Sequence, residues 1–495
     1  MPFPSLMASL FGLHPTSPLS FARPSFFLPK PPFPGRPSFR NRSRNDHDIV
    51  KRSTKIANSL DLEPKSKPKP LTFDLPRLNP IDPTRFDVIV IGAGPAGLRV
   101  SEQVSQHGLK VCCVDPSPLS MWPNNYGGWV DEFESLGFED CLHKIWPVTS
   151  VYIDDQTSRD LDRAYARVDR SALKSKLLSH CTANGVKFHE AKVRRVEHGE
   201  FESSSSIIVC DDGTRLAADL IVDAGGFASG FVEHDRRGNP GYQVAHGILA
   251  EVDEHPFDLN KMVLMDYRDS HLANDPQLLK NNSKLPTFLY AMPLEPNLIF
   301  LEETSLVSRP AMSGTEVRDR LVARLRHWGI RVREVVEDEK CAILMGGPLP
   351  RIPQRVVAMG GNSGLVHPST AYMLTRMMAL APEVAGSIAH GGSPWESLWP
   401  AERRREREFY NLGMEMLLRL DLGGTRRFLN AFFELEPLYL EGFFSCGLTM
   451  REILGFGLSV FWHGSGLAKV DLVTKGPVAL ASLVANNLAP GALSF

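Results

Sequence analysis

The 495-residue sequence lacks several features that mark common protein classes. It has no basic excess, since 55 Lys and Arg face 57 Asp and Glu and leave a net charge of −2. Surfaces that bind nucleic acid need such an excess to neutralise phosphates, so nucleic acid is an unfavourable partner. The seven cysteines are odd in number and form no C-x-x-C pair, so neither a disulfide framework nor a metal site is predicted. No uninterrupted apolar stretch of about twenty residues predicts a transmembrane helix.

The amino-terminal segment lacks acidic residues altogether. Residues 1–45 contain no Asp or Glu and are rich in Ser, Pro and Arg. Such a composition cannot pack a core, and it matches plastid or mitochondrial transit peptides better than a secretory signal, with a disordered tail as the alternative. The frequency of proline favours the plastid. Residues 46–84 are predicted to be a linker because they become Pro-rich toward their end. Ordered structure is expected to start near Arg85.

A dinucleotide-binding pattern opens the part that is expected to fold. Residues 86–91 (FDVIVI) are typical of a buried parallel strand. They run into a loop in which Gly92, Gly94 and Gly97 occupy the glycine positions of G-x-G-x-x-G, before a predicted helix over 95–107. A second strand over 109–114 leads to Asp115, where a carboxylate would bind a ribose hydroxyl. This order of elements predicts a bound dinucleotide, with a tight structural turn as the alternative.

Two later glycine segments favour FAD over NAD. One expected strand carries Asp223 into Gly225, and another, over 355–359, leads into Gly361 and Asn362. Together with the first loop they resemble the glutathione-reductase-type FAD fold of aromatic hydroxylases. A second G-x-G-x-x-G after a strand is absent, so a separate NAD(P) domain is not predicted.

These patterns predict an α/β fold with several lobes, as expected for a chain of this length. We expect an FAD-binding Rossmann part over 85–240, an antiparallel substrate-binding sheet over 241–340, a return to the FAD domain over 341–390 and a helical region over 391–495. Residues 453–468 and 476–495 carry no formal charge, so either segment could lie in a membrane interface, with packing onto the core as the alternative.

Residues 286–305 (PTFLYAMPLEPNLIFLEETS) are predicted to form a β-hairpin joined by 293–297. Because side chains alternate along a strand, the two adjacent glutamates cannot share one site. One should enter a pocket and the other should leave it. Desolvation among apolar neighbours raises the pKa of a carboxyl group and makes it a usable proton donor near neutral pH. The two expected faces are Phe300, Glu302 and Thr304 on one side, and Leu301, Glu303 and Ser305 on the other.

The same hairpin carries a resemblance to a known family. The string FLEET (Phe300, Leu301, Glu302, Glu303, Thr304), with NNYG at 124–127, MDYRDSH at 265–271, MGGPLP at 345–350 and VHPST at 366–370, closely resembles the plant lycopene β-cyclase and capsanthin/capsorubin synthase family. The resemblance runs from about residue 86 to the carboxyl end and is stronger to the chromoplast branch. Three positions depart from the pattern: Gly128, Leu344 and Ala371. Ala371 stands where the family often has glycine, which would matter if the backbone there needs a positive φ.

The resemblance implies a plastid enzyme at a membrane surface that isomerises a carotenoid without net redox change. It implies reduced FAD maintained by NADPH, with Glu302 as the catalytic acid. Protonation would start β-ring formation from lycopene, κ-ring formation from antheraxanthin and violaxanthin, or both. The alternatives are a redox flavin monooxygenase acting on a hydrophobic substrate and a non-enzymatic prenyl-lipid escort protein. Whether the chain forms a homo-oligomer is left open.

Some further residues receive expectations of their own. Two acidic residues are reserve candidates for a second catalytic carboxylate, with structural roles as the alternative. Three aromatic residues are expected either to line a polyene tunnel or to pack in the core. His367 is expected to be structural or to pack against the cofactor, with a catalytic base as the alternative. The reserve carboxylates are Asp266 and Asp269, and the aromatic residues are Trp122, Tyr126 and Trp129.

Overall fold

The structure of the protein is a computed structural model. It describes residues 62, 64, 68–79, 85–199, 205–235 and 239–488. The predicted transit peptide over 1–45 lies outside the described residues, as do residues 489–495. Residues 60–495 group into one compact unit.

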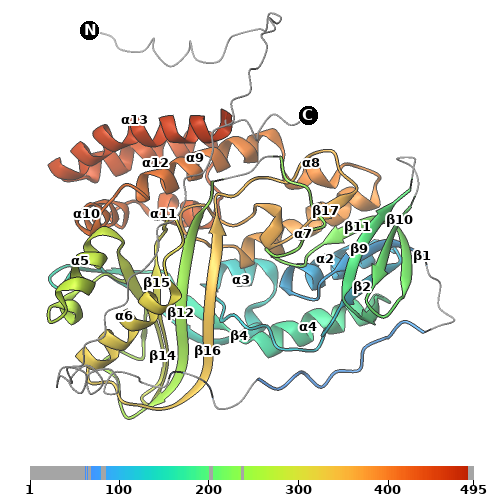
Figure 1. Ribbon diagram of the computed structural model, residues 1–495, viewed down its shortest axis with the longest axis horizontal. Helices are drawn as coiled ribbons and strands as arrows, with labels where there is room; N and C mark the ends of the chain where they lie inside the picture. Colours follow the sequence, from blue (N-terminus) through green and yellow to red (C-terminus); the bar gives the residue numbers. More distant parts are fainter. Residues whose placement is uncertain are drawn as a thin grey trace, which may run out of the picture. The chain divides into compact units, whose positions relative to one another are not determined.

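The first sheet has a parallel core that joins distant parts of the chain (Figure 1). Its order is β8–β2–β1–β11–β10–β9, and β17 also pairs with β11. The apolar run of β1 is buried between parallel neighbours on both sides, as its composition predicts. Helices α2, α4 and α7 pack with this sheet in one core, which confirms the Rossmann part of the predicted fold. The bounds are β1 (Arg85–Ile91), α2 (Pro95–Gln106), β2 (Val111–Asp115), α4 (Arg170–Ala183), β8 (Lys187–Glu190), β9 (Val193–His198), β10 (Ser206–Cys210), β11 (Arg215–Asp223), β17 (Val356–Ala358) and α7 (Leu374–Ala389).

The second sheet has the order β16–β12–β15–β14–β13–β5–β6 and is antiparallel except for the pair β5 and β13. The predicted hairpin is present as β14 and β15, but its turn is shorter than the expected 293–297, because Pro293 and Leu294 belong to β14. One face of this sheet packs against α6. The bounds are β5 (Val148–Tyr152), β6 (Ser158–Leu161), β12 (Gly241–Val252), β13 (Lys261–Asp266), β14 (Thr287–Glu295), β15 (Leu298–Ser305), α6 (Gly314–His327) and β16 (Val332–Met345).

The carboxyl-terminal helices cover the other face of the second sheet. Their apolar side chains share a core with β13, β14 and β15, and in Figure 1 these orange and red helices gather near one end of the long strands β12 and β16. They are α9 (Ala401–Leu417), α10 (Leu422–Phe432), α11 (Pro437–Ser445), α12 (Met450–His463) and α13 (Gly466–Leu488). Helix α8 (Pro394–Leu398) instead packs on α7 in the first core. A three-stranded sheet of β3 (Gly127–Trp129), β7 (Tyr165–Val168) and β4 (Leu142–Trp146) completes the strands, while α3 (Val130–Leu136) follows β3 and α5 (Pro276–Lys284) precedes β14.

Part of the predicted linker is structured. Leu71 donates its backbone N–H to the Leu119 carbonyl, and Arg77 forms a parallel bridge with Phe188 of β8. Leu75 is buried in the first core. Ordered structure therefore begins before Arg85, because the Pro-rich segment lies along the edge of the sheet, which its composition does not reveal.

Ala371, which stands where the family often has glycine, has a positive φ. Its φ is +61°, one of two positive φ values among the described non-glycine residues. A Cβ atom in this left-handed region approaches the following carbonyl and costs about 1–2 kcal/mol. Gly128, another departure from the family pattern, is explained by its neighbours. A Cβ there would lie 2.5 Å from the Phe133 ring and 2.7 Å from the Tyr372 hydroxyl, so the surrounding side chains leave room only for glycine.

We therefore expect Ala371→Gly to stabilise the protein. Relief of the strained φ outweighs the added entropy of the unfolded chain, so the free energy of unfolding should rise by about 0.5–1 kcal/mol. Chemical denaturation measures this change. Ala379→Gly, at an exposed position inside α7, is the matched control and should lower stability by about 1 kcal/mol. Equal losses in the two variants would contradict the strain at Ala371.

Candidate functional site

The predicted cofactor residues gather at one edge of the first sheet, because its parallel strands all end there. Gly92 follows β1, while Asp115 and Asp223 end β2 and β11. Gly361 follows β17, the parallel neighbour of β11. Backbone hydrogen bonds from Gly92 to Val114 (2.8 Å) and from Met359 to Asp223 (2.9 Å) tie these strand ends together.

The glycine loop has the shape that a pyrophosphate needs. Gly92 has a φ of +102°, and a Cβ on Gly97 would lie 1.9 Å from the Gly92 carbonyl oxygen, so both positions require glycine. Gly94 differs, because a Cβ there would meet no atom within 4 Å. It precedes α2 with no side-chain cap, which leaves the amide groups of the first turn available to an anion.

Polar groups around the loop fit the remainder of FAD. The Asp115 carboxylate accepts hydrogen bonds from the Ala93 amide (2.8 Å) and the Ser117 amide (2.7 Å), and each oxygen keeps a second lone pair that suits a ribose hydroxyl. Asn362 is buried beside Asp223, yet neither its Oδ1 nor its Nδ2 has a hydrogen-bond partner of ordinary geometry among the described residues. Buried polar atoms are rarely left unpaired, so this amide fits a bound ligand.

Asp223 and Gly225 shape the loop after β11. The Asp223 carboxylate accepts hydrogen bonds from the Gly225 amide (2.9 Å) and from the Ser229 hydroxyl (2.5 Å). Burial raises the pKa of Asp223, although these two donors oppose the shift. This carboxylate thus holds the loop and is available to the cofactor only through its remaining lone pairs.

Glu302 lines a small cavity of about 130 Å³ between the second sheet and the carboxyl-terminal helices. Burial raises the pKa of its carboxyl group well above the usual range, and the neighbouring Glu339 raises it further. Its side chain is half-buried and forms part of the wall of this cavity. The lining residues are Trp129, Tyr165, Gln243, Leu264, Met265, Phe288, Tyr290, Glu302, Thr304, Thr370, Tyr372 and Phe444.

Glu303 points to the opposite face of β15, as alternation predicts. It is fully buried and forms an ion pair with Arg324 of α6, whose Nε lies 2.6 Å from the Glu303 carboxylate. Thr287 also donates a hydrogen bond to it. The neighbouring residues alternate in the same way: Phe300 packs in the core shared with the carboxyl-terminal helices, and Leu301 packs in the core shared with α6. Glu303 is thus a structural anion, which leaves Glu302 to face the cavity.

The two reserve carboxylates lie outside this cavity. Asp266 is buried and paired with Arg268, and Asp269 is paired with Arg426. The second carboxylate near Glu302 is instead Glu339 of β16, which sequence reasoning missed. A single sequence gives no signal for it, because its approach depends on the order β16–β12–β15 in the sheet.

Aromatic rings form much of the wall around Glu302. Trp129 lines the cavity and makes an edge contact with Tyr165 at 4.9 Å between ring centroids, whereas Trp122 and Tyr126 are not among the lining residues. Tyr165 and Tyr290 were not predicted from sequence. Tyr290 could have been found from the register of the predicted hairpin, because it pairs directly with Glu302.

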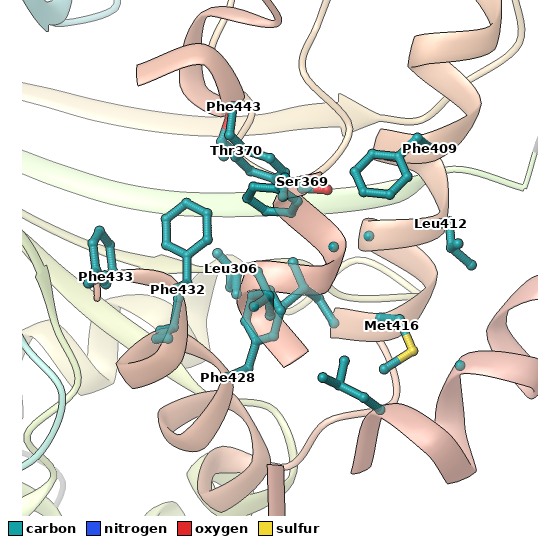
Figure 2. Close-up of a pocket in the computed structure, with 18 of the residues that line it drawn as sticks. Leu306, Ser369, Thr370, Phe409, Leu412, Met416, Phe428, Phe432, Phe433 and Phe443 are labelled. Atoms are coloured by element: carbon teal, nitrogen blue, oxygen red, sulfur yellow. The ribbon is translucent and has the colours of Figure 1, made fainter. Parts of the chain in front are cut away.

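A larger apolar cavity of about 400 Å³ adjoins the first one, since Met265, Thr370 and Phe444 line both. Figure 2 shows phenylalanine rings from α9, from α10 and its carboxyl end, and from α11 around this space. Residues of α12 and α13 complete the lining, among them Phe456, Val460 and Leu472. The two cavities thus place a large apolar space next to the Glu302 carboxyl group.

His367 connects the cofactor edge to these helices. Its Nδ1 accepts hydrogen bonds from the Ser369 amide (3.0 Å) and the Thr370 amide (3.2 Å), and its Nε2 donates to the Phe443 carbonyl (3.0 Å). Burial lowers the pKa of His367 to about 3, so the ring is neutral and structural, as expected.

Comparison with known proteins agrees with this geometry. Residues 87–469 match the family described as lycopene cyclase protein. The chain is 57% identical to capsanthin/capsorubin synthase of Citrus sinensis, over 97% of this chain and 99% of that protein. It is 55% identical to a neoxanthin synthase of Solanum lycopersicum, over 98% of each chain. It is 52% identical to a lycopene beta cyclase of Capsicum annuum, over 87% of this chain and 88% of the relative.

A solved structure shares the fold. The anhydrotetracycline hydroxylase OxyS of Streptomyces rimosus aligns with a TM-score of 0.54 at 14% identity, over 73% of this chain and 76% of that one. This likeness confirms the predicted fold class, in which a Rossmann part is combined with a substrate sheet and further helices.

Two glycine substitutions separate the fold of the loop from ligand binding. Gly94→Ala should leave the stability of the flavin-free protein within about 1 kcal/mol of wild type, because no protein atom is near the new methyl group. It should nevertheless lower flavin affinity about tenfold or more, because the methyl group fills the open space above the loop. Gly97→Ala should lower the unfolding temperature even without flavin. Denaturation and flavin titration measure the two effects, and unchanged flavin affinity in Gly94→Ala would place the pyrophosphate elsewhere.

Proposed function

The chain belongs to the lycopene cyclase family, and on that premise we propose that it forms carotenoid end rings by acid-initiated isomerisation. The observation that carries the proposal is Glu302, a carboxyl group in a cavity with aromatic walls that adjoins a larger apolar one. A raised pKa keeps such a group protonated near neutral pH, as a general acid requires.

Glu302 acts on lycopene by donating its proton to the terminal double bond. The resulting tertiary cation is attacked by the nearby internal double bond, which closes the ring. Loss of a ring proton then gives the β-ring, and the proton returns to a carboxylate. Atoms and electrons balance without an oxidant, so the product is an isomer of the substrate.

The same acid serves an epoxy-xanthophyll such as antheraxanthin or violaxanthin. Proton donation to the epoxide oxygen opens a C–O bond and leaves a tertiary cation. A pinacol-type shift contracts the ring to the κ-ketone, and the hydroxyl proton is lost. The name capsanthin/capsorubin synthase of a relative supports this reaction, and the name lycopene beta cyclase of another supports β-ring formation.

The aromatic wall suits a carbocation. Trp129 and Tyr290 present π-systems to the cavity that holds Glu302, and a cation over an aromatic face is stabilised by about 2 kcal/mol when desolvated.

FAD fits the edge of the first sheet, where Gly92, Gly94 and Gly97 would hold the pyrophosphate and Asp115 a ribose. Asp223, Gly225, Gly361 and Asn362 would hold the remainder. When bound in its reduced form, kept so by NADPH, FAD supplies an electron-rich ring whose negative charge favours a nearby cation. Thr370 lines both cavities and follows the loop of Gly361 and Asn362, so the carotenoid end would lie close to this edge.

We place the enzyme in the plastid, at a membrane surface. Names of the relatives that include chloroplastic and chromoplastic support the plastid. Among the described residues no helix is long and apolar enough to cross a membrane. Several apolar side chains of α12 and α13 are nevertheless exposed, including Leu458 (73%), Trp462 (80%) and Leu467 (65%), and both helices also line the large cavity. This face is suited to lie in a lipid interface and to admit a carotenoid.

Replacement of Glu302 tests the proposed chemistry. We expect Glu302→Gln to abolish ring formation in cells that accumulate lycopene, and separately in cells that accumulate antheraxanthin or violaxanthin, because the amide cannot donate a proton of the required acidity. Pigment analysis measures the products, and bound flavin should be unchanged. Glu295→Gln, at an exposed position near the end of β14 in the same hairpin, is the matched control and should retain activity.

Other outcomes would point to the alternatives. Pigment output that is unchanged in Glu302→Gln would move the acid role elsewhere. Product formation that consumes oxygen and NADPH in stoichiometric amounts would indicate a monooxygenase. A protein that held carotenoid but bound no flavin would be an escort protein.

Charge on α12 tests the membrane surface. The double variant Leu458→Glu and Trp462→Glu should lower binding to phosphatidylcholine vesicles containing phosphatidylglycerol by about tenfold or more, since it removes two large apolar contacts with lipid. Cosedimentation measures binding. Leu279→Glu on α5, which is also exposed, is the control and should bind as wild type does. Equal binding of all three proteins would exclude α12 from the lipid contact.

A further inference from the structure

Two carboxyl groups flank one glycine on a single face of the second sheet. Gly247 of β12 pairs directly with Glu302 of β15 on one side and with Glu339 of β16 on the other. Directly paired residues of antiparallel strands point to the same face, and two strand spacings separate the two backbones by about 10 Å. The two long side chains can therefore approach each other across Gly247, which has no side chain of its own.

The space above Gly247 is filled by an aromatic ring. A Cβ on Gly247 would lie 2.7 Å from the Phe300 ring and 3.3 Å from the Glu302 Cβ. The medium between the carboxyl groups is thus largely apolar, so their interaction is screened less than it would be in water.

The two carboxyl groups differ in their hydrogen bonds. Glu339 accepts from the Asn124 side-chain amide at Oε1 (2.8 Å) and from the Asn125 backbone amide at Oε2 (2.8 Å). Both oxygens act as acceptors, which suits the ionised form, and Arg170 lies nearby. Glu302 has no such donors among the described residues, and it alone lines the cavity.

The charged and titratable groups that face this pair come from every neighbouring element. Burial raises the pKa of both carboxyl groups, but the donors around Glu339 oppose the rise there and favour its ionised form. The groups that interact with one or both are Tyr126, Tyr165, Arg170, Tyr290 and Cys341. Glu337, two residues before Glu339 on β16, lies beside them, and its carboxylate forms ion pairs with Arg170 (2.6 Å) and Arg167 (3.5 Å).

We propose that Glu339 is the positioning partner of Glu302, an ionised carboxylate across Gly247 that keeps Glu302 in its protonated, proton-donating form. This inference rests on the proposed function of Glu302 as the acid. Pairs of carboxyl groups in unlike environments divide acid and base forms in this way. It also gives a role to the NNYG segment at 124–127, whose two asparagines hold Glu339 in place.

The pH dependence of ring formation by the flavin-loaded full-length chain tests this role. Glu302 must be protonated to act, so activity falls as pH rises through its pKa. Glu339→Gln removes the neighbouring negative charge, lowers that pKa and should move the alkaline limb of the profile to lower pH by about one unit. Glu339→Asp retains the charge and should keep the limb close to its wild-type position.

Two further measurements separate this role from damage to the fold. Asp338→Asn makes the same charge change at the adjacent position, on the opposite face of β16, and should leave the profile unchanged. In the flavin-free chain, the infrared C=O band of the protonated carboxyl group that is lost in Glu302→Gln should disappear at lower pH in Glu339→Gln than in wild type.

The outcomes distinguish the inference from the function it rests on. If Glu302→Gln abolishes ring formation while the Glu339→Gln profile and infrared titration coincide with those of wild type, Glu339 has no positioning role. If Glu302→Gln is fully active, the proposed acid itself is wrong. A shift shared equally by Asp338→Asn would show a general effect of charge and would also overturn the pairing.

Discussion

A carboxyl group holds its proton at neutral pH only where water and cationic side chains are kept away from it, and much of this architecture meets that condition around Glu302. Alternation along β15 turns Glu303 toward Arg324 and the helix α6, so the cation that could lower the pKa of Glu302 is occupied on the other face of the sheet. The cavity face carries aromatic and aliphatic side chains. One strand thus supplies both a structural anion and a candidate acid.

The cofactor edge and the acid cavity meet through one loop. The segment that follows β17 contributes Gly361 and Asn362 to the predicted flavin site and Thr370 to both cavities. His367 and Ser369 tie this segment to the carboxyl-terminal helices, through hydrogen bonds to the carbonyls of Phe443 (3.0 Å) and Tyr410 (2.9 Å). The strained Ala371 lies at the end of the same segment. The predicted flavin site, the cavities and the helical cover therefore share one segment of backbone.

The carboxyl-terminal helices join two tasks that a carotenoid enzyme must combine. Their inner side chains, such as Phe432 and Phe443, enclose the large cavity, while Leu458 and Trp462 are exposed to the surroundings. Transfer of an apolar substrate into water costs free energy, so an apolar cavity beside an exposed apolar face would lower the cost of taking such a substrate from lipid.

Local patterns in the sequence determined the glycine loop, the strand that ends at Asp115 and the opposite faces of Glu302 and Glu303. Strand periodicity and glycine stereochemistry act over a few residues, so a single sequence reveals them. The family resemblance added the prediction that Glu302 is the catalytic acid. The sequence could not reveal Glu339, Tyr165 or the packing of residues 71–79 on the sheet edge. These depend on which distant strands pair and in what register. The tertiary structure alone decided that a glycine would lie between two carboxyl groups, since β12 separates β15 from β16 only once the sheet has formed.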